Sequence, residues 1–229
     1  MANIKRIKGR RESQSPSGYT RLFGNSELGN LMSKIQGAVI ASGTELEKLI
    51  WGRVQQIRDF DDFISKAIRE DTKGIWVAKK NQVKTSKYIN AKYEPDFLAF
   101  DVSKHICYVI EVKDGDQFDT KKSNSEYVAL HEFADAVKYA LPLEFQVRIC
   151  CFNANTKIEI YNGLKRKFSL SEILTGQELC ELLQINYFDI TTARYKDQQE
   201  NLEFFASQLL SIPVIKQLIF TYLESENIY

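Results

Sequence analysis

The sequence predicts an α/β (α+β) fold in which helices flank a central mixed β-sheet and a helical region follows toward the C-terminus. Three observations lead to this prediction. Residues 93–115 contain two apolar runs of β-branched and aromatic residues joined by a short polar connection, which is typical of a hairpin. Helical periodicity occurs on both sides of this stretch. Beyond residue 168 the pattern is helical.

The first strong helical pattern covers residues 44–57, where apolar residues recur at helical spacing and form one stripe. Thr44 with Glu47 fits a capping box, as does Ser42 with Glu45, so capping is the ordinary explanation of both acids. A short apolar run, Ile75-Trp-Val-Ala78, is the candidate first strand of the sheet.

The hairpin follows this strand. Residues 97–100 form its first strand and residues 106–112 its second. The four residues at 102–105 suit a connection built around a type I turn. This turn length determines which residues face each other across the hairpin.

The hairpin register places three charges on one patch. If Asp101 faces Ile106, then Asp96 lies directly opposite Glu111. Because side chains alternate between the two faces of a strand, Lys113 shares a face with Glu111. Two opposed carboxylates are destabilising unless positive charge lies between them, and a divalent cation supplies it. The alternative is a surface hairpin whose charges are solvated.

The second half of the sheet is predicted after a polar loop. A helix runs from about residue 125 to 141, with Ser123 and Glu126 as its capping box. A strand at 145–152 follows, and a right-handed crossover would make it parallel to the strand before the helix. Alternation at 157–161 predicts another strand.

The C-terminal region is predicted to be helical, and part of its apolar surface is a candidate dimer interface. We expect residues 1–18 to form a basic flexible tail and residues 19–229 a single domain, with its core at about 44–161 and its helical part at about 169–225. The individual helices are predicted at 169–174, 177–184, 191–210 and 213–224.

Composition is that of an ordinary globular protein. The chain has 229 residues, 44% of them hydrophobic and 27% charged, with 31 Lys+Arg against 30 Asp+Glu, so no overall basicity indicates nucleic acid. No apolar run approaches the roughly 20 residues that span a bilayer, and we expect a soluble, cytoplasmic protein without membrane contact. The four cysteines lack C-x-x-C spacing, which favours buried free thiols over a zinc site.

Pro95-Asp96 followed by Glu111-Val112-Lys113 resembles the motif of the PD-(D/E)xK nuclease superfamily, to which most type II restriction endonucleases belong. In that family the aspartate begins the second core strand and the glutamate and lysine end the third, which agrees with the register above. The segment Gly43-x-x-Leu46-Glu47 resembles the first helix of many of these nucleases, where a glutamate leans over the metal site. The resemblance therefore favours Glu47, with Glu45 second, as a fourth catalytic residue.

The resemblance implies a restriction-endonuclease-like core and hydrolysis of double-stranded DNA that leaves 5′-phosphate ends. The hard oxygens of Asp96 and Glu111 suit Mg²⁺ as ligands, while Lys113 would orient the attacking water and stabilise the developing charge. We expect a type II restriction endonuclease that is a homodimer, because a twofold protein matches a palindromic site. Two alternatives stay open: a repair or recombination nuclease with the same core, such as a junction resolvase or mismatch nickase, and a non-catalytic DNA-binding protein.

Candidate DNA contacts lie in three polar segments. The basic N-terminal tail would reach phosphates or a groove, although it is equally explained as a solubilising terminus. The loop at 116–124 and the segment at 162–167 are candidate base readers, because Arg addresses guanine and Asn or Gln addresses adenine. The candidate residues are Lys5, Arg6, Lys8, Arg10, Arg11, Gln117, Lys121, Lys122, Asn124, Lys165, Arg166 and Lys167.

Overall fold

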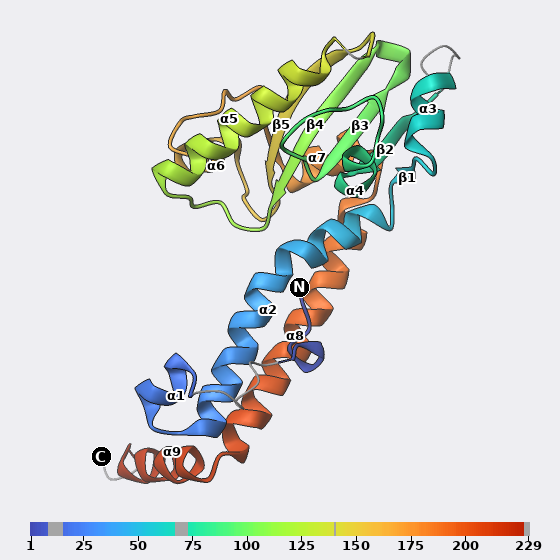
Figure 1. The fold of residues 1–229 in the computed structure, drawn as a ribbon. Coiled ribbons are helices and arrows are strands. Elements are labelled where there is room, and N and C mark those ends of the chain that lie inside the picture. Colours follow the sequence, from blue (N-terminus) through green and yellow to red (C-terminus); the bar gives the residue numbers. More distant parts are fainter. Residues whose placement is uncertain (9–15, 67–72, 140, 227–229) are drawn as a thin grey trace. The chain divides into compact units, whose positions relative to one another are not determined.

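The computed structural model describes residues 1–8, 16–66, 73–139 and 141–226 (Figure 1). Its contacts group into two compact units. The sheet unit comprises Glu47–Phe188, and the helical unit comprises Met1–Leu46 together with Asp189–Tyr229. The contacts thus do not follow the predicted division into a tail at 1–18 and a single domain at 19–229.

One mixed sheet organises the sheet unit. Its strands are hydrogen bonded in the order β1-β2-β3-β4-β5-β6. β2, β3 and β4 form an antiparallel meander, whereas the pairs β1 with β2, β4 with β5 and β5 with β6 are parallel. The predicted mixed sheet and the predicted parallel crossover strand are confirmed. The strands are β1 (Gln55–Gln56), β2 (Ile75–Lys79), β3 (Phe97–Asp101), β4 (Ile106–Lys113), β5 (Glu144–Cys151) and β6 (Ile173–Thr175).

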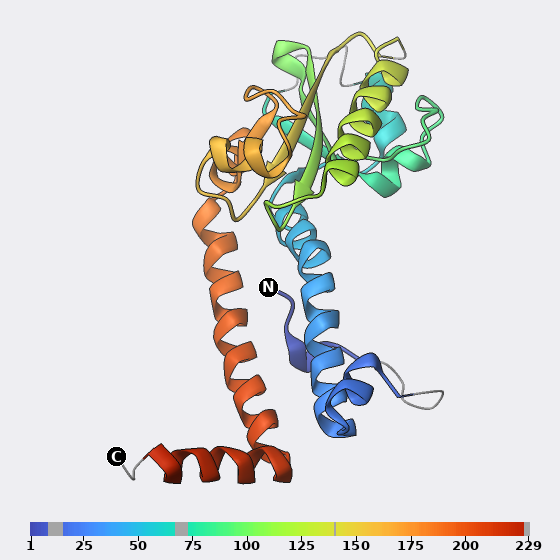
Figure 2. The same ribbon diagram turned by 90° about the vertical axis from the view of Figure 1, so that its left-hand side faces the viewer.

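The core of this unit lies between the sheet and its helices, with α5 on one face and α7 on the other (Figures 1 and 2). Leu130, Phe133 and Val137 of α5 are at most 1% exposed and cluster with Phe100 and Val109 of the hairpin. Burial of each such side chain stabilises the fold by about 1.5–3 kcal/mol. The helices are α3 (Phe60–Lys66), α4 (Lys80–Lys84), η3 (Val102–Lys104), α5 (Thr120–Val137), α6 (Lys157–Gly163) and α7 (Gly176–Leu182).

The hairpin has the predicted register. The ladder begins at Phe97, one residue after Asp96, so Asp96 directly precedes β3. At the other end the connection is the short helix η3, whose N-cap side chain accepts a hydrogen bond from the Lys104 N–H. The observed pairs are Phe97 with Ile110, Leu98 with Val109, Ala99 with Tyr108, Phe100 with Cys107, and Asp101 with Ile106.

α5 begins earlier than predicted. Its N-cap is Asp119, whose side chain accepts from the backbone N–H of Lys122 at 2.7 Å. The predicted cap at Ser123 is therefore wrong, because Ser123 is a buried residue inside the helix. Lys121, Lys122 and Asn124, which were expected in a loop, lie in the first turns of α5.

Two predicted elements after β5 have the wrong type. Residues 157–161 form the helix α6 instead of a strand, because Thr156 and Glu159 form a capping box. The alternation of Ile158 and Ile160 predicted a strand, but two apolar residues at this spacing also fit within one turn of a helix. Residues 169–174 are not helical: 169–172 form a turn, and 173 and 174 belong to β6, which pairs with β5. The predicted helix at 177–184 is confirmed as α7.

The helix predicted at 44–57 is part of α2 (Ser26–Trp51). Thr44 lies inside this helix and Ser42 donates to the Ala38 carbonyl, so neither serves as an N-cap. The capping explanation of Glu45 and Glu47 is therefore wrong. From Glu47 onward α2 belongs to the sheet unit, whereas Glu45 belongs to the helical unit.

The helical unit contains the first residues of the chain. Ala2, Asn3 and Ile4 are buried, and the Asn3 amide donates to Glu200 Oε2 at 2.7 Å, so these residues pack against α8 instead of forming a flexible tail. Arg10 and Arg11 lie outside the described residues. The elements are η1 (Ile4–Arg6), α1 (Gly18–Phe23), the first part of α2, α8 (Tyr187–Ser211) and α9 (Pro213–Glu226).

Two predictions about the whole chain can be compared with the structure. The four cysteines are buried free thiols, as predicted. Within the described ranges no single helix is long and apolar enough to cross a membrane; α8 and α9 pass that test only as a pair, and they are bent by 92°.

The capping box of α6 gives a stability prediction. Thr156→Ala removes the Oγ1 that accepts from the Glu159 N–H, and we expect a loss of about 1 kcal/mol in the free energy of unfolding. Thr156→Ser keeps the acceptor and should restore most of the loss. Urea unfolding measures both variants. An unchanged free energy in Thr156→Ala would contradict a capped helix at this position.

Candidate active site

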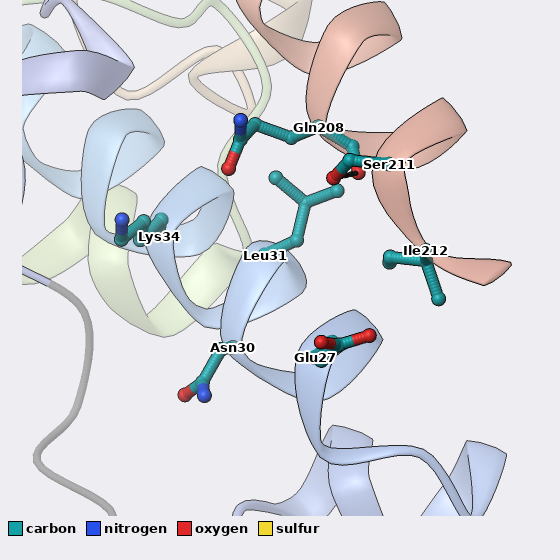
Figure 3. A pocket seen from close by; sticks show the side chains of 7 residues that line it. All are labelled: Glu27, Asn30, Leu31, Lys34, Gln208, Ser211 and Ile212. Atoms are coloured by element: carbon teal, nitrogen blue, oxygen red, sulfur yellow. Dashed lines mark hydrogen bonds between the residues drawn. The ribbon is translucent and has the colours of Figure 1, made fainter.

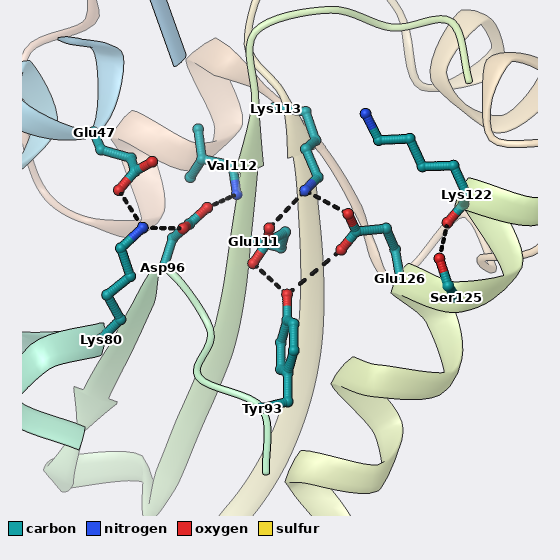
Figure 4. A network of polar contacts seen from close by, with 10 residues as sticks. All are labelled: Glu47, Lys80, Tyr93, Asp96, Glu111, Val112, Lys113, Lys122, Ser125 and Glu126. Atoms are coloured by element: carbon teal, nitrogen blue, oxygen red, sulfur yellow. Dashed lines mark hydrogen bonds and ion pairs between the residues drawn. The ribbon is translucent and has the colours of Figure 1, made fainter. Parts of the chain in front are cut away.

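Asp96, Glu111 and Lys113 belong to one network of polar contacts around strand β4 (Figure 4). Asp96 and Glu111 are only 8% and 7% exposed. The alternative of a surface hairpin with solvated charges is therefore wrong for these two residues. Asp96 Oδ2 accepts a hydrogen bond from the backbone N–H of Val112 at 3.0 Å. This bond holds the Asp96 carboxylate against β4, next to the residue that carries the second carboxylate.

Glu111 lies in a buried environment next to other charged groups. Burial and then the neighbouring Asp96 carboxylate raise the pKa of Glu111 to about 7. Two donors oppose this effect: Lys113 Nζ lies 2.6 Å from Glu111 Oε1, and Tyr93 Oη donates to Glu111 Oε2 at 2.7 Å. The carboxylate is thus held at both oxygens.

Lys113 lies between two carboxylates. Its Nζ is 2.6 Å from Glu111 Oε1 and 2.7 Å from Glu126 Oε1. Burial of the ammonium opposes its charge, but the attraction of Glu111 and Glu126 is larger and raises the pKa of Lys113. The Tyr93 hydroxyl also contacts Glu126, at 3.5 Å. These four residues form a closed ring of polar contacts.

A second lysine bridges the other side of the site. Lys80 Nζ lies 3.0 Å from Glu47 Oε2 and 3.3 Å from Asp96 Oδ1. Burial and then the Asp96 carboxylate raise the pKa of Glu47, while Lys80 lowers it. Glu47, the favoured fourth residue, is therefore part of the same network as Asp96.

Sequence reasoning identified four members of this network and missed three. Asp96, Glu111, Lys113 and Glu47 were predicted, and the structure brings them together. The missed residues are Lys80, Tyr93 and Glu126. Each had a signal in the sequence: Lys80 follows the predicted first strand, Tyr93 comes three residues before Asp96, and Glu126 was assigned to a capping box.

The donor set of the site fits a small hard cation. Among the described residues no group of three or more His, Cys, Asp or Glu is arranged to hold a metal ion. Mg²⁺, however, usually takes one or two carboxylates and completes its shell with water and substrate phosphate. Asp96 and Glu111 supply two such carboxylates, nearly buried and close enough for one to raise the pKa of the other.

The two candidate DNA-reading segments lie next to each other. The Phe118 N–H donates to the Gly163 carbonyl at 3.2 Å. A side chain at position 163 would collide with the Asp116 carbonyl, so glycine is required for this close approach. Lys165 and Arg166 have φ values of 55° and 58°, an uncommon conformation for residues other than glycine. The candidate residues of both segments are exposed: Gln117, Lys121, Lys122, Asn124, Lys165, Arg166 and Lys167.

The remaining described candidates belong to the helical unit. Lys5, Arg6 and Lys8 are exposed there, and their contact with DNA stays a prediction. The same unit has a pocket between α2 and α8 (Figure 3). It contains no cluster of carboxylates comparable to that of the sheet unit. Its lining residues are Glu27, Asn30, Leu31, Lys34, Gln208, Ser211 and Ile212.

Comparison with known proteins gives one informative match. The chain is 41% identical over 223 residues to the type II restriction enzyme HhaII of Haemophilus parahaemolyticus, and the match covers 95% of this chain and 97% of that enzyme. The similarity is longer than either unit and is not confined to the hairpin. No protein-family model matches the chain. No solved structure matches it significantly.

The raised pKa of Glu111 gives a prediction about pH and stability. Its folded value of about 7 lies above the ordinary value of 4.5, so folding favours the protonated carboxyl. The resulting stabilisation is fully present below the ordinary value and is lost as pH rises through the folded pKa. Relative to Glu111→Gln, the metal-free wild type should therefore lose on the order of 1–3 kcal/mol between about pH 4.5 and about pH 8.

Urea unfolding in EDTA at both ends of this pH range measures the effect. Glu132→Gln, the same chemical change at an exposed position of α5, serves as the control. A difference between wild type and Glu111→Gln that does not change with pH would contradict the buried, charge-coupled environment of Glu111.

Proposed function

The chain belongs to the type II restriction enzymes, and on that premise we propose that Asp96, Glu111 and Lys113 form its catalytic centre. The observation that carries the proposal is the pair of nearly buried carboxylates, Asp96 and Glu111, with Lys113 Nζ 2.6 Å from Glu111 Oε1. In this proposal the hairpin is the motif-bearing part of a PD-(D/E)xK nuclease core. The reaction is hydrolysis of double-stranded DNA at a short specific sequence, leaving 5′-phosphate ends.

Asp96 and Glu111 would hold Mg²⁺. When bound, Mg²⁺ polarises the phosphate and lowers the pKa of a coordinated water. The protein fixes the two carboxylates in advance: the Val112 N–H holds Asp96, and the Tyr93 hydroxyl holds Glu111. Such preorganisation removes the need to reorient these groups during the reaction.

Lys113 would stabilise the charge that develops on the phosphate. Its ammonium is largely buried and keeps its proton, because two carboxylates lie within 2.7 Å. A fixed positive charge in a site that excludes water is worth more than the same charge in solvent. Glu47, joined to Asp96 through Lys80, is the fourth proposed member.

Sequence specificity would come from other residues, because a metal ion and a lysine contact only the DNA backbone. We assign it to the two neighbouring segments joined by the bond from Phe118 to Gly163. Gln117 and Arg166 have the side-chain chemistry for paired hydrogen bonds to base edges. The lysines at 121, 122, 165 and 167 are exposed and would contact phosphates.

The proposed active form is a homodimer, because one copy of the centre cuts one strand. Val214, Leu218 and Tyr222 of α9 are spaced by four residues and form one stripe. They are 47%, 49% and 69% exposed, an unusual exposure for an apolar helix face. This stripe supports an interface with a second copy in the helical unit.

A cleavage assay tests the catalytic centre. Purified protein with Mg²⁺ should cut a large duplex DNA into a reproducible set of discrete fragments. Asp96→Asn and Lys113→Met should each lower the rate by about a hundredfold or more, without loss of folding. Lys104→Met, which removes an exposed lysine paired with Asp101 in the turn of the same hairpin, should cleave like the wild type.

Each other outcome excludes part of the proposal. A smear of products would indicate a nonspecific nuclease, and cutting only at junctions or mismatches would indicate a repair enzyme. Tight DNA binding without cleavage in any divalent metal would indicate a non-catalytic DNA-binding protein. Full activity in a folded Lys113→Met protein would remove Lys113 from the centre.

Analytical ultracentrifugation tests the dimer. Leu218→Glu introduces a charge into the α9 stripe and should shift the protein toward monomer, with nicked circular DNA accumulating during cleavage. Lys216→Glu also adds an acid to α9, but by helical spacing it lies on the opposite side, so it should leave the dimer intact. A wild type that is monomeric with and without DNA would contradict the proposed interface.

A further inference from the structure

Lys80 is placed to interact with the site in two ways. It is the first residue of α4 and directly follows β2. Its backbone N–H donates to the Asp96 carbonyl at 3.3 Å. Its side chain then returns to the same residue, with Nζ 3.3 Å from Asp96 Oδ1 and 3.0 Å from Glu47 Oε2 (Figure 4). The backbone and the side chain of Lys80 together therefore place its ammonium beside the Glu47 and Asp96 carboxylates.

The charges of the network divide into two groups. Lys113 is engaged by Glu111 and Glu126. Lys80 bridges the remaining two carboxylates, Glu47 and Asp96. Two carboxylates this close to each other repel, so a cation between them is needed to hold both charged. In the protein alone, the Lys80 ammonium supplies that positive charge.

We propose that Lys80 is an internal counter-ion: in the metal-free protein its ammonium neutralises Glu47 and Asp96, and a divalent cation that binds at Asp96 must displace it. This inference rests on the proposed function, in which Asp96 is a metal ligand. Both cations need the same oxygen lone pairs, and their like charges repel at short distance. Occupation by one therefore opposes occupation by the other.

The chemistry of lysine suits such an exchange. Its side chain is 46% exposed, and a flexible four-carbon stem lets the ammonium move into solvent without moving the backbone. A phosphate of bound DNA would give the displaced ammonium a new partner. In the free enzyme Lys80 therefore keeps Glu47 and Asp96 in position and weakens metal binding. Once DNA is bound, Lys80 moves to a phosphate and no longer weakens metal binding.

Isothermal titration of Ca²⁺ into DNA-free protein tests the inference without relying on activity. Lys80→Met should bind Ca²⁺ about tenfold more tightly than the wild type, because a like charge has been removed from beside the ion. The control is Lys84→Met, which removes a lysine from the same helix α4. Lys84 lies 3.6 Å from Glu94 and does not contact Glu47 or Asp96, so this variant should bind like the wild type.

A second variant separates folding from binding. Lys80→Gln is neutral but keeps a hydrogen-bond donor, and we expect the same tighter binding if Lys80→Met does not fold. In EDTA both variants should melt below the wild type, because Glu47 and Asp96 lose their shared cation. Addition of Ca²⁺ should raise the melting temperature of the variants more than that of the wild type.

The outcomes distinguish this inference from the proposed function. If the wild type binds Ca²⁺ and the Lys80 variants bind equally or more weakly, Lys80 is not displaced, while the proposed metal site is retained. If no protein binds Ca²⁺, both the inference and the proposed metal site are overturned.

Discussion

The pairing of β3 with β4 determines where the charged groups of the site lie. Because side chains alternate along a strand, a slip of one residue would move Glu111 and Lys113 to the other face of the sheet. The register is held by five residue pairs, from Phe97 with Ile110 to Asp101 with Ile106. Asp96 lies just outside this ladder, and its carboxylate takes the Val112 N–H at 3.0 Å. The position of Glu111 thus depends on the pairing of β4, and the position of Asp96 depends on where β3 begins.

This geometry has an energetic cost that the surrounding lysines offset. Two nearly buried carboxylates are unfavourable in a protein interior unless cations and hydrogen-bond donors surround them. Lys113 forms ion pairs with Glu111 and Glu126. Lys80 forms ion pairs with Asp96 and Glu47. The two lysines face four carboxylates, and burial together with the Asp96 carboxylate raises the pKa of Glu111 to about 7. A site that is left short of positive charge is suited to accept a divalent ion.

Sequence reasoning succeeded where structure is determined locally. The two-residue period and the four-residue connection gave the hairpin register, and with it Asp96, Glu111 and Lys113. It failed where local patterns are ambiguous: the isoleucines at 158 and 160 fit a strand or a helical turn, and the capping box decided for the helix. The start of α2 was missed because glycines interrupt residues 26–43, and glycine is a weak helix former.

The missed site residues share a physical reason. Lys80, Tyr93 and Glu126 come from α4, a loop and α5, and only tertiary packing brings them to the hairpin. No spacing rule links a residue at 126 to one at 113. Glu47 was identified only through a resemblance to other nucleases. The capping box that would have explained it otherwise is not formed, because Thr44 lies inside α2. Local sequence therefore predicted the charged patch of Asp96, Glu111 and Lys113, and the three-dimensional fold supplied its counter-ions and hydrogen-bond donors.

Anomalous diffraction from crystals grown with Mn²⁺ would show whether the proposed site at the Asp96 and Glu111 carboxylates binds a divalent cation. We expect an anomalous peak within coordination distance of both carboxylates. A site elsewhere in the protein, or a fully bound DNA complex without a peak at these two residues, would contradict it.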